Sequence, residues 1–112
     1  MSRTITEVPL KTNNVDQVLN IISAKMKASG YQEKIVDDET VWAKGDGVMI
    51  KMQCLSAVFT WKSVIIQGWM KDVVTGESNL EGLAAILPKK KLKNIINEIC
   101  IAITSGSIPK FV

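Results

Sequence analysis

Four lysines lie within five positions, at Lys89, Lys90, Lys91 and Lys93, directly after Pro88 and at the start of an apolar helical stripe. Positive charges at the start of a helix oppose the helix dipole, so a bound anion would offset an unfavourable field. Free backbone amides and lysine ammonium groups together favour a phosphate group, an acidic protein or a membrane surface. A solvated charged end that only keeps the protein soluble is the alternative interpretation.

Three tryptophans offer large flat surfaces with one hydrogen-bond donor each, at Trp42, Trp61 and Trp69. Trp69 shares one face of its predicted strand with Gln67 and Lys71. If helices do not cover that face, Trp69 and Lys71 would form an exposed site that stacks bases, sugars or a partner's side chains. The alternative is that Trp69 packs in the core under the helices.

The chain contains no histidine, which removes the usual general base and the commonest transition-metal ligand. Cys54 lies in an apolar strand and Cys100 in an apolar helical stripe, and both positions favour inert core thiols. We therefore predict no catalytic residue and a non-enzymatic binding module. The competing hypothesis is an enzyme or small-ligand carrier with a pocket between sheet and helices, using Cys54, Asp46 or Asp72.

Two short segments resemble ligand loops, but each is explained by a turn. Asp37, Asp38 and Glu39 could hold a hard cation, yet the spacing is not that of an EF-hand and no further ligands follow. The segment Gly45–Gly47 matches neither a Walker loop nor a dinucleotide fingerprint, because strands flank it. The sequence predicts neither a metal nor a cofactor.

The composition limits the remaining functions. The 112 residues are 46% hydrophobic and 22% charged, which predicts one packed domain over residues 1–106 followed by a tail at 107–112. A mean hydropathy of +0.15 is high for so small a domain, and surplus apolar surface makes a homodimer plausible. A net charge of +3 is too small to predict dedicated nucleic-acid binding.

The chain shows no sign of export or membrane insertion. Its first residues lack the apolar core of a signal peptide, and no apolar run approaches the length that spans a bilayer. The two cysteines lie in apolar segments and form no CxxC pair, which fits buried, reduced thiols. We expect a soluble cytoplasmic protein.

The order of elements predicts an α+β fold. A strand at Thr4–Val8 stops at Pro9, and a helix runs from Val15 to Gly30 with Asn13 or Asn14 as its N-cap. Further strands are predicted at Tyr31–Val36, Thr40–Lys44, Val48–Trp61 and Val64–Lys71, with a loop or small hairpin over Asp72–Gly82. A second helix should begin at Pro88 and end near Gly106.

The expected architecture is a mainly antiparallel sheet of about five strands in the order β-α-β-β-β-β-α, with two helices packed on one face. Within Val48–Trp61, the apolar face switches from Met52 and Cys54 to Leu55 and Ala57. A bulge near Ser56 would explain that switch.

Several short motifs follow one another in the chain: T-V-W-A-K-G-D-G at 40–47, Trp69 in a strand, Gly82, and I-L-P-K-K at 86–90 before a helix. In these motifs the chain resembles a group of uncharacterised small proteins from Gram-positive bacteria, whose signature is V-W-x-K-G-x-G followed by a late P-K-K helix. The resemblance covers roughly residues 30–103.

The resemblance implies an α+β fold and a bacterial cytoplasmic setting, and it implies no particular activity. Some relatives add a zinc ribbon or a membrane segment after this domain, which suggests a module that works beside other parts. This chain has no zinc-ligand cluster and ends at Val112, so a function supplied by such an extension is not carried over.

Overall fold

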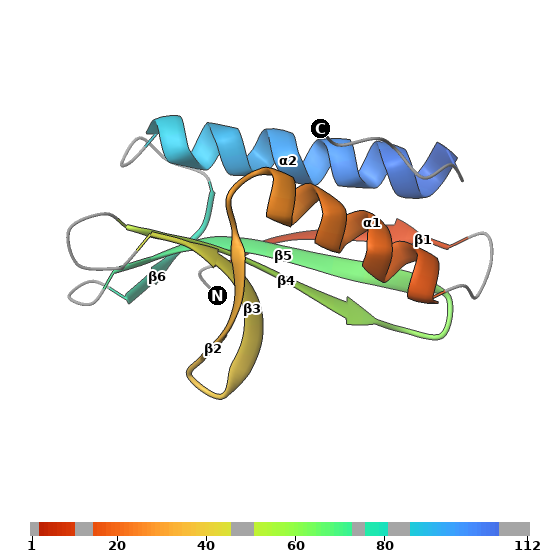
Figure 1. Cartoon of the computed structure of the whole chain (residues 1–112), viewed down its shortest axis with the longest axis horizontal. Coiled ribbons are helices and arrows are strands. Elements are labelled where there is room, and N and C mark those ends of the chain that lie inside the picture. Colours follow the sequence, from red (N-terminus) through yellow and green to blue (C-terminus); the bar gives the residue numbers. More distant parts are fainter. Residues whose placement is uncertain (1–2, 11–14, 46–50, 73–75, 81–85, 106–112) are drawn as a thin grey trace.

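A computed structural model of the chain describes residues 3–10, 15–45, 51–72, 76–80 and 86–105 (Figure 1). Its elements are β1 (Thr4–Pro9), α1 (Val15–Ala28), β2 (Gln32–Val36), β3 (Glu39–Lys44), β4 (Met52–Phe59), β5 (Ser63–Asp72), β6 (Gly76–Ser78) and α2 (Ile86–Ser105). The predicted α+β class is confirmed. The sheet has six strands instead of about five, because the segment expected to be a loop or small hairpin contributes β6.

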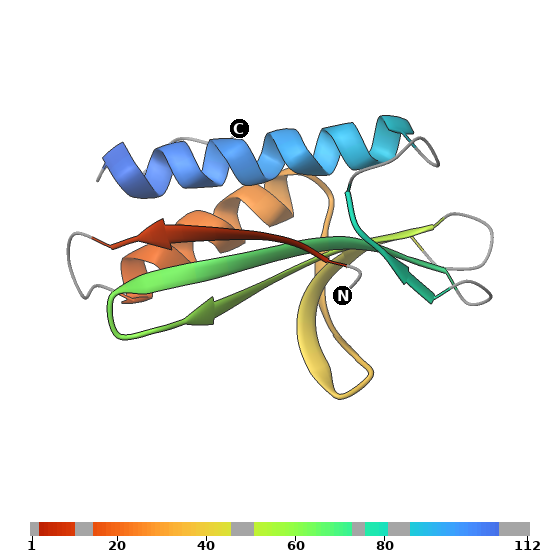
Figure 2. The ribbon, with the colours of Figure 1, turned by 180° about the vertical axis from the view of Figure 1, so that it is seen from behind.

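All strand pairs are antiparallel, and the strand order is β1-β5-β4-β3-β2. The short strand β6 pairs with the end of β5, beyond the stretch that pairs with β1. Both helices lie on one face of this sheet, as Figure 2 shows from behind. The long strand β5 lies between β4 and the short strands β1 and β6, and β1 is an edge strand, a position in which its Pro9 is tolerated.

Helix α1 ends where the sequence predicted. Gly30 adopts a positive φ of 88°, which a side chain would disfavour. The amide of Gly30 donates to the Lys27 carbonyl at 3.1 Å, and the amide of Tyr31 donates to the Met26 carbonyl at 2.9 Å. This pair of bonds is a Schellman motif, so the last carbonyls of the helix are satisfied.

Helix α2 begins at Ile86, two residues before the predicted start, and it ends at Ser105. Pro88 still lies in the first turn, where a missing amide proton breaks no helical hydrogen bond. No helix among the described residues is both long and apolar enough to span a membrane. The predicted N-cap at Asn13 or Asn14 and the tail at 107–112 lie outside the described residues.

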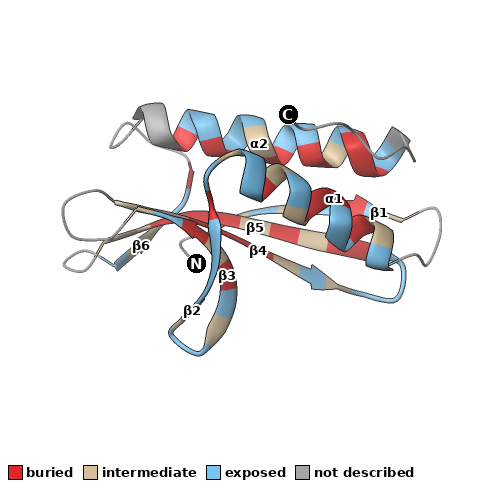
Figure 3. Ribbon diagram, viewed as in Figure 1, coloured by how far each residue is buried: buried red, intermediate tan, exposed pale blue. Residues whose placement is uncertain are grey.

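The main core fills the space between the helices and the sheet. Val64, Ile66 and Met70 of β5 face it, and they meet apolar side chains of both helices. At Gly68, an added Cβ would lie only 2.7 Å from the Ile96 side chain, so α2 packs closely against the centre of the sheet. Figure 3 shows buried positions along both helices and along β5.

A second, smaller core lies on the other face of the sheet. It consists of Val41, Ala43, Cys54 and Trp69, all buried. The β2–β3 hairpin leaves the plane of the sheet and projects to the side away from the helices (Figure 1), and this curl encloses the second core.

The second core also explains the apolar switch in β4. The β4–β5 register is continuous from Met52 opposite Lys71 to Phe59 opposite Val64, so the predicted bulge near Ser56 is wrong. Cys54 packs in the second core and Leu55 in the main core. Adjacent residues of β4 are both apolar because both faces of the sheet are buried there.

Tight turns connect the strands of the β2–β3 and β4–β5 hairpins. Asp37 and Asp38 both have positive φ, of 51° and 65°, as the two central residues of a type I′ turn require. Between β4 and β5, the amide of Thr60 donates to the Ser63 carbonyl at 2.8 Å. Trp61, which the pattern placed at the end of a strand, therefore lies in this turn and is 83% exposed.

Candidate functional site

The structure separates the four lysines at the start of α2 into different environments. Lys89 is only 4% exposed, whereas Lys90, Lys91 and Lys93 are exposed. Lys93 lines a small depression beside β1, and Lys91 lines a groove on another side of the helix. The first turn of α2 itself contains no acidic residue.

The groove beside Lys91 brings in a lysine from a distant strand. Its volume is about 610 Å³, and Lys44 at the end of β3 lines it together with Lys91. Lys44 Nζ donates to the Ser29 carbonyl at 3.2 Å and lies 5.8 Å from the centre of the Tyr31 ring. The end of α1 therefore holds this ammonium group at the groove, beside the start of α2.

Two other polar contacts shape the same groove. The Tyr31 hydroxyl donates to Gln53 Oε1 at 2.8 Å, and burial raises the pKa of this hydroxyl, so it stays a neutral donor. Glu98 is the acidic residue of the groove, and it forms an ion pair with Lys25 of α1. Since Lys25 compensates Glu98, the charge that the groove presents comes mainly from Lys44 and Lys91. We name Lys44, Lys90 and Lys91 the basic end.

Trp69 does not form an exposed platform. It is only 1% exposed, and it lies in the second core on the face away from the helices. The guanidinium carbon of Arg3 lies 3.6 Å from the centre of its ring, a stacked cation–π contact. The predicted grouping of Gln67, Trp69 and Lys71 on one face is correct, but Arg3 and the β2–β3 hairpin cover Trp69.

Arg3 uses all five of its N–H groups. Two donate to Glu39 at 2.8 and 3.0 Å, two to Glu77 at 2.9 Å each, and one to Gln67 at 3.0 Å. These bonds hold the pKa of the Glu77 carboxyl below its usual value. Arg3 thus joins the start of the chain, the β2–β3 hairpin and β6 across the second core.

Lys71 takes part in the same assembly. It forms an ion pair with Asp37 in the turn of the β2–β3 hairpin, and this contact raises the pKa of the Lys71 ammonium group. Lys71 therefore ties the hairpin to β5.

The cation site considered for Asp37, Asp38 and Glu39 has no support: among the described residues no three His, Cys, Asp or Glu side chains gather as a metal site would require.

Neither cysteine is placed for nucleophilic chemistry. Cys54 is fully buried in the second core, and burial raises its pKa to about 12. Burial also raises the pKa of the half-buried Cys100. Both thiols are therefore protonated near neutral pH, where the thiolate is the reactive form.

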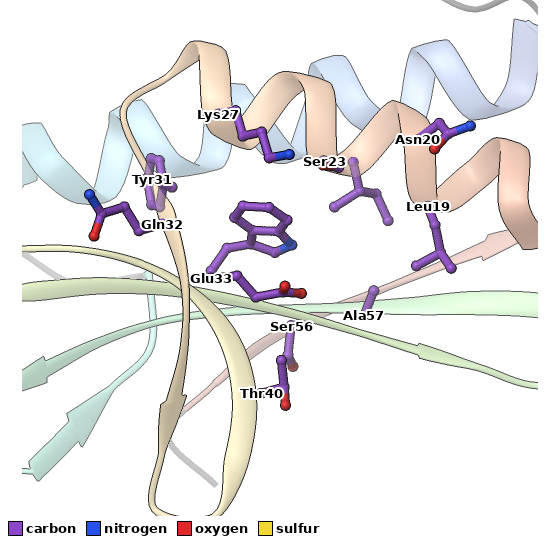
Figure 4. A pocket seen from close by; sticks show the side chains of 12 residues that line it. Leu19, Asn20, Ser23, Lys27, Tyr31, Gln32, Glu33, Thr40, Ser56 and Ala57 are labelled. Atoms are coloured by element: carbon purple, nitrogen blue, oxygen red, sulfur yellow. The ribbon is translucent and has the colours of Figure 1, made fainter.

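A second groove lies between α1, the β2–β3 hairpin and β4, and its volume is about 610 Å³ (Figure 4). Leu19 and Ser23 reach it from α1, Glu33 from β2, and Trp42 and Ala57 from β3 and β4. The competing hypothesis placed Cys54, Asp46 and Asp72 at a pocket between sheet and helices. Neither Cys54 nor Asp72 lines this groove, and Asp46 lies outside the described residues.

Comparison of the chain with protein-family models, curated proteins and solved structures found no match. The resemblance described above therefore remains a prediction.

Sequence reasoning identified the lysines of α2 but missed Lys44 and Arg3. Lys44 stands in the predicted strand Thr40–Lys44, and only the register of β3 with β4 brings it to the groove. Arg3 carries one signal in the sequence: it is an isolated cation next to the first strand. Its partners are 36, 64 and 74 positions away, so no local pattern could name them.

Proposed function

We propose that the chain is a non-enzymatic binding module that contacts an anionic partner through the basic end. The observation that carries the proposal is the convergence of Lys44 from β3 with Lys91 from α2 on one groove. Two lysines that line one groove from separate elements can contact the same anion, and the contact of Lys44 with Ser29 reduces the ordering that binding would require of that side chain. Lys90, which precedes Lys91 on α2, is also exposed and adds to the positive charge at this end of the helix.

The start of α2 favours the same partner. A helix start carries a partial positive charge, and lysines there are unfavourable unless an anion is bound. The first turn of α2 holds no acidic residue of its own among the described residues. A phosphate group, an acidic protein or a membrane surface would each supply compensating negative charge, so these are the partner classes we propose.

Binding to vesicles tests the proposal. We expect the protein to bind vesicles of phosphatidylglycerol and not those of phosphatidylcholine, with affinity falling as salt rises. Each basic side chain near an anionic surface contributes about 1 kcal/mol, so K90Q/K91Q should weaken binding about thirtyfold. A parallel titration with polyglutamate distinguishes an acidic protein from a lipid surface.

A matched variant controls for net charge. Lys34 on β2 and Lys62 in the β4–β5 turn are also exposed, and K34Q/K62Q removes the same two charges. We expect this variant to bind within about twofold of the unaltered protein, because its charges lie away from the basic end. Equal weakening by both double variants, or no binding to either polyanion, would overturn the proposal.

A further inference from the structure

The second half of β4 has an open outer edge. β3 pairs with β4 only from Trp42 opposite Leu55 to Lys44 opposite Gln53, and the hairpin then turns away. Ser56–Phe59 continues to pair with β5 on its other side. No other described strand lies against the outer edge of this stretch. Such an edge presents backbone groups that can pair with another strand.

The sequence of this edge differs from that of the other edges. The stretch from 55 to 61 reads L-S-A-V-F-T-W, with no charge, proline or glycine. By contrast, β1 carries Glu7 and Pro9, and β2 carries Glu33 and Lys34. Charges and proline are the means by which natural edges resist pairing. The β4 edge lacks them, as is expected of an edge that another strand covers.

Exposed apolar side chains gather around the same edge. The described residues include seven exposed large hydrophobics, and four of them are Val15 and Leu19 on α1, Val58 on β4 and Trp61 in the following turn. Leu19 lines the second groove directly beside β4 (Figure 4). Apolar surface concentrated at one place is typical of an interaction site.

We propose that this edge pairs with the same edge of a second copy of the chain, in antiparallel orientation. In an antiparallel pair, two residues that lie opposite each other point to the same face of the sheet. A twofold axis normal to the sheet also keeps each face in place, so the residue beside the axis must lie opposite its own copy in the partner. Centring on Ala57 would set the partner's Phe59 against Leu55, where β3 already pairs. Centring on Phe59 would set Ala57 against the partner's Trp61, which lies in the turn and not in the strand. The axis therefore passes beside Val58, so that Ser56 to Thr60 pair and only the turn residue Trp61 extends as far as Leu55.

The charges of α1 suit this arrangement. The helix carries Asp16 in its first turn and Lys27 in its last, where Lys25 already pairs with Glu98. Two copies of α1 related by the twofold axis run antiparallel, so the acidic start of one lies towards the basic end of the other. A second copy is thus electrostatically complementary to this surface.

The pairing also provides a place for the exposed Trp61. With Val58 at the centre, Ser56 faces the partner's Thr60, and the partner's Trp61 reaches the point where β3 leaves β4. The second groove lies there, with Trp42 and Leu19 in its lining. Trp61 is then the apolar anchor of the interface, a role for which tryptophan is enriched.

Engineered cysteines test the register. Val58 is 47% exposed, and opposite residues of antiparallel strands lie within reach of a disulfide. In a Cys100→Ser background, Val58→Cys should form a covalent dimer under mild oxidation. Ile35→Cys serves as the control, because Ile35 is 76% exposed and lies on β2. If Val58→Cys forms a disulfide dimer no faster than Ile35→Cys, the proposed register is wrong.

Sedimentation equilibrium tests the interface without cross-linking. The unaltered chain should dimerise, and Trp61→Ala and Leu19→Lys should each raise the dissociation constant at least about tenfold. Ile35→Thr, which also removes exposed apolar surface, should leave the constant unchanged. Circular dichroism verifies that each variant is folded. A chain that stays monomeric at about 1 mM, or one whose dimer is insensitive to both variants, contradicts the proposal.

Discussion

Arg3 shows how one side chain can hold together segments that are distant in sequence. Its stacking on Trp69 keeps the guanidinium flat against the second core, and both glutamates engage it in a two-bond geometry. Such planar, bidentate contacts are specific to arginine, since lysine offers a single ammonium group. The residue therefore closes the face of the sheet that the helices leave uncovered.

Replacing Arg3 with methionine should destabilise the protein by about 2 kcal/mol, because Glu39 and Glu77 lose charged hydrogen bonds while they remain partly buried. Urea unfolding measures this change. Arg3→Lys should recover less than half of the loss, and Lys34→Met, an exposed change on β2, should alter stability by less than about 0.5 kcal/mol. A stability of R3M equal to that of the unaltered protein would show that the Arg3 network contributes nothing.

The Glu77 carboxyl makes the free energy of unfolding depend on pH in the acid range. Its pKa in the folded protein is below the ordinary value of 4.5, so the folded state favours the ionised form. The contribution is fully present above that ordinary value and is lost as pH falls through the folded pKa. Glu77→Gln should therefore show a shallower fall in the free energy of unfolding as pH drops below about 4.5. Parallel pH curves for the two proteins would exclude this origin.

At the scale of elements, the hairpins and helices follow from local chemistry. The 3.6-residue apolar period predicted both helices, and Gly30 predicted the end of α1. The two aspartates predicted the β2–β3 turn. The expected bulge near Ser56 was wrong because periodicity counts only one buried face, and the second core was not visible in the sequence.

The positive φ of Asp38 gives a prediction for the β2–β3 turn. Glycine adopts φ of 65° without strain, so Asp38→Gly should stabilise the protein by about 0.5 kcal/mol. Asp37→Gly relieves similar strain but removes the ion pair with Lys71, so it should stabilise less. Thermal unfolding of both variants measures the difference. A lower melting temperature for Asp38→Gly than for the unaltered chain would contradict the assigned turn.

At the scale of the whole molecule, the sheet buries its two faces by different means. The helices cover one face with a large apolar core, while the β2–β3 hairpin and Arg3 cover part of the other. The sequence predicted the first layer, because amphipathic helices show which face they bury. It could not predict the second, because the curl of the hairpin depends on strand pairing that stops at Leu55.

Only part of the candidate site could be predicted from the sequence, because the rest depends on strand pairing. The lysines of α2 are adjacent in sequence and were identified from it, although burial removes Lys89 from the surface. Lys44 reaches the groove only through the order and register of β3 and β4. The basic end is therefore a property of the fold, because Lys44 joins Lys91 only through the pairing of the strands.

The most direct test compares Lys44→Gln with Lys34→Gln in binding to phosphatidylglycerol vesicles. Both lysines are exposed, both lie on strands of the β2–β3 hairpin, and both substitutions remove one charge. We predict that Lys44→Gln weakens binding about fivefold, as Lys91→Gln does, and that Lys34→Gln has less than a twofold effect. Equal affinities for the Lys44 and Lys34 variants would show that the groove is not the binding site.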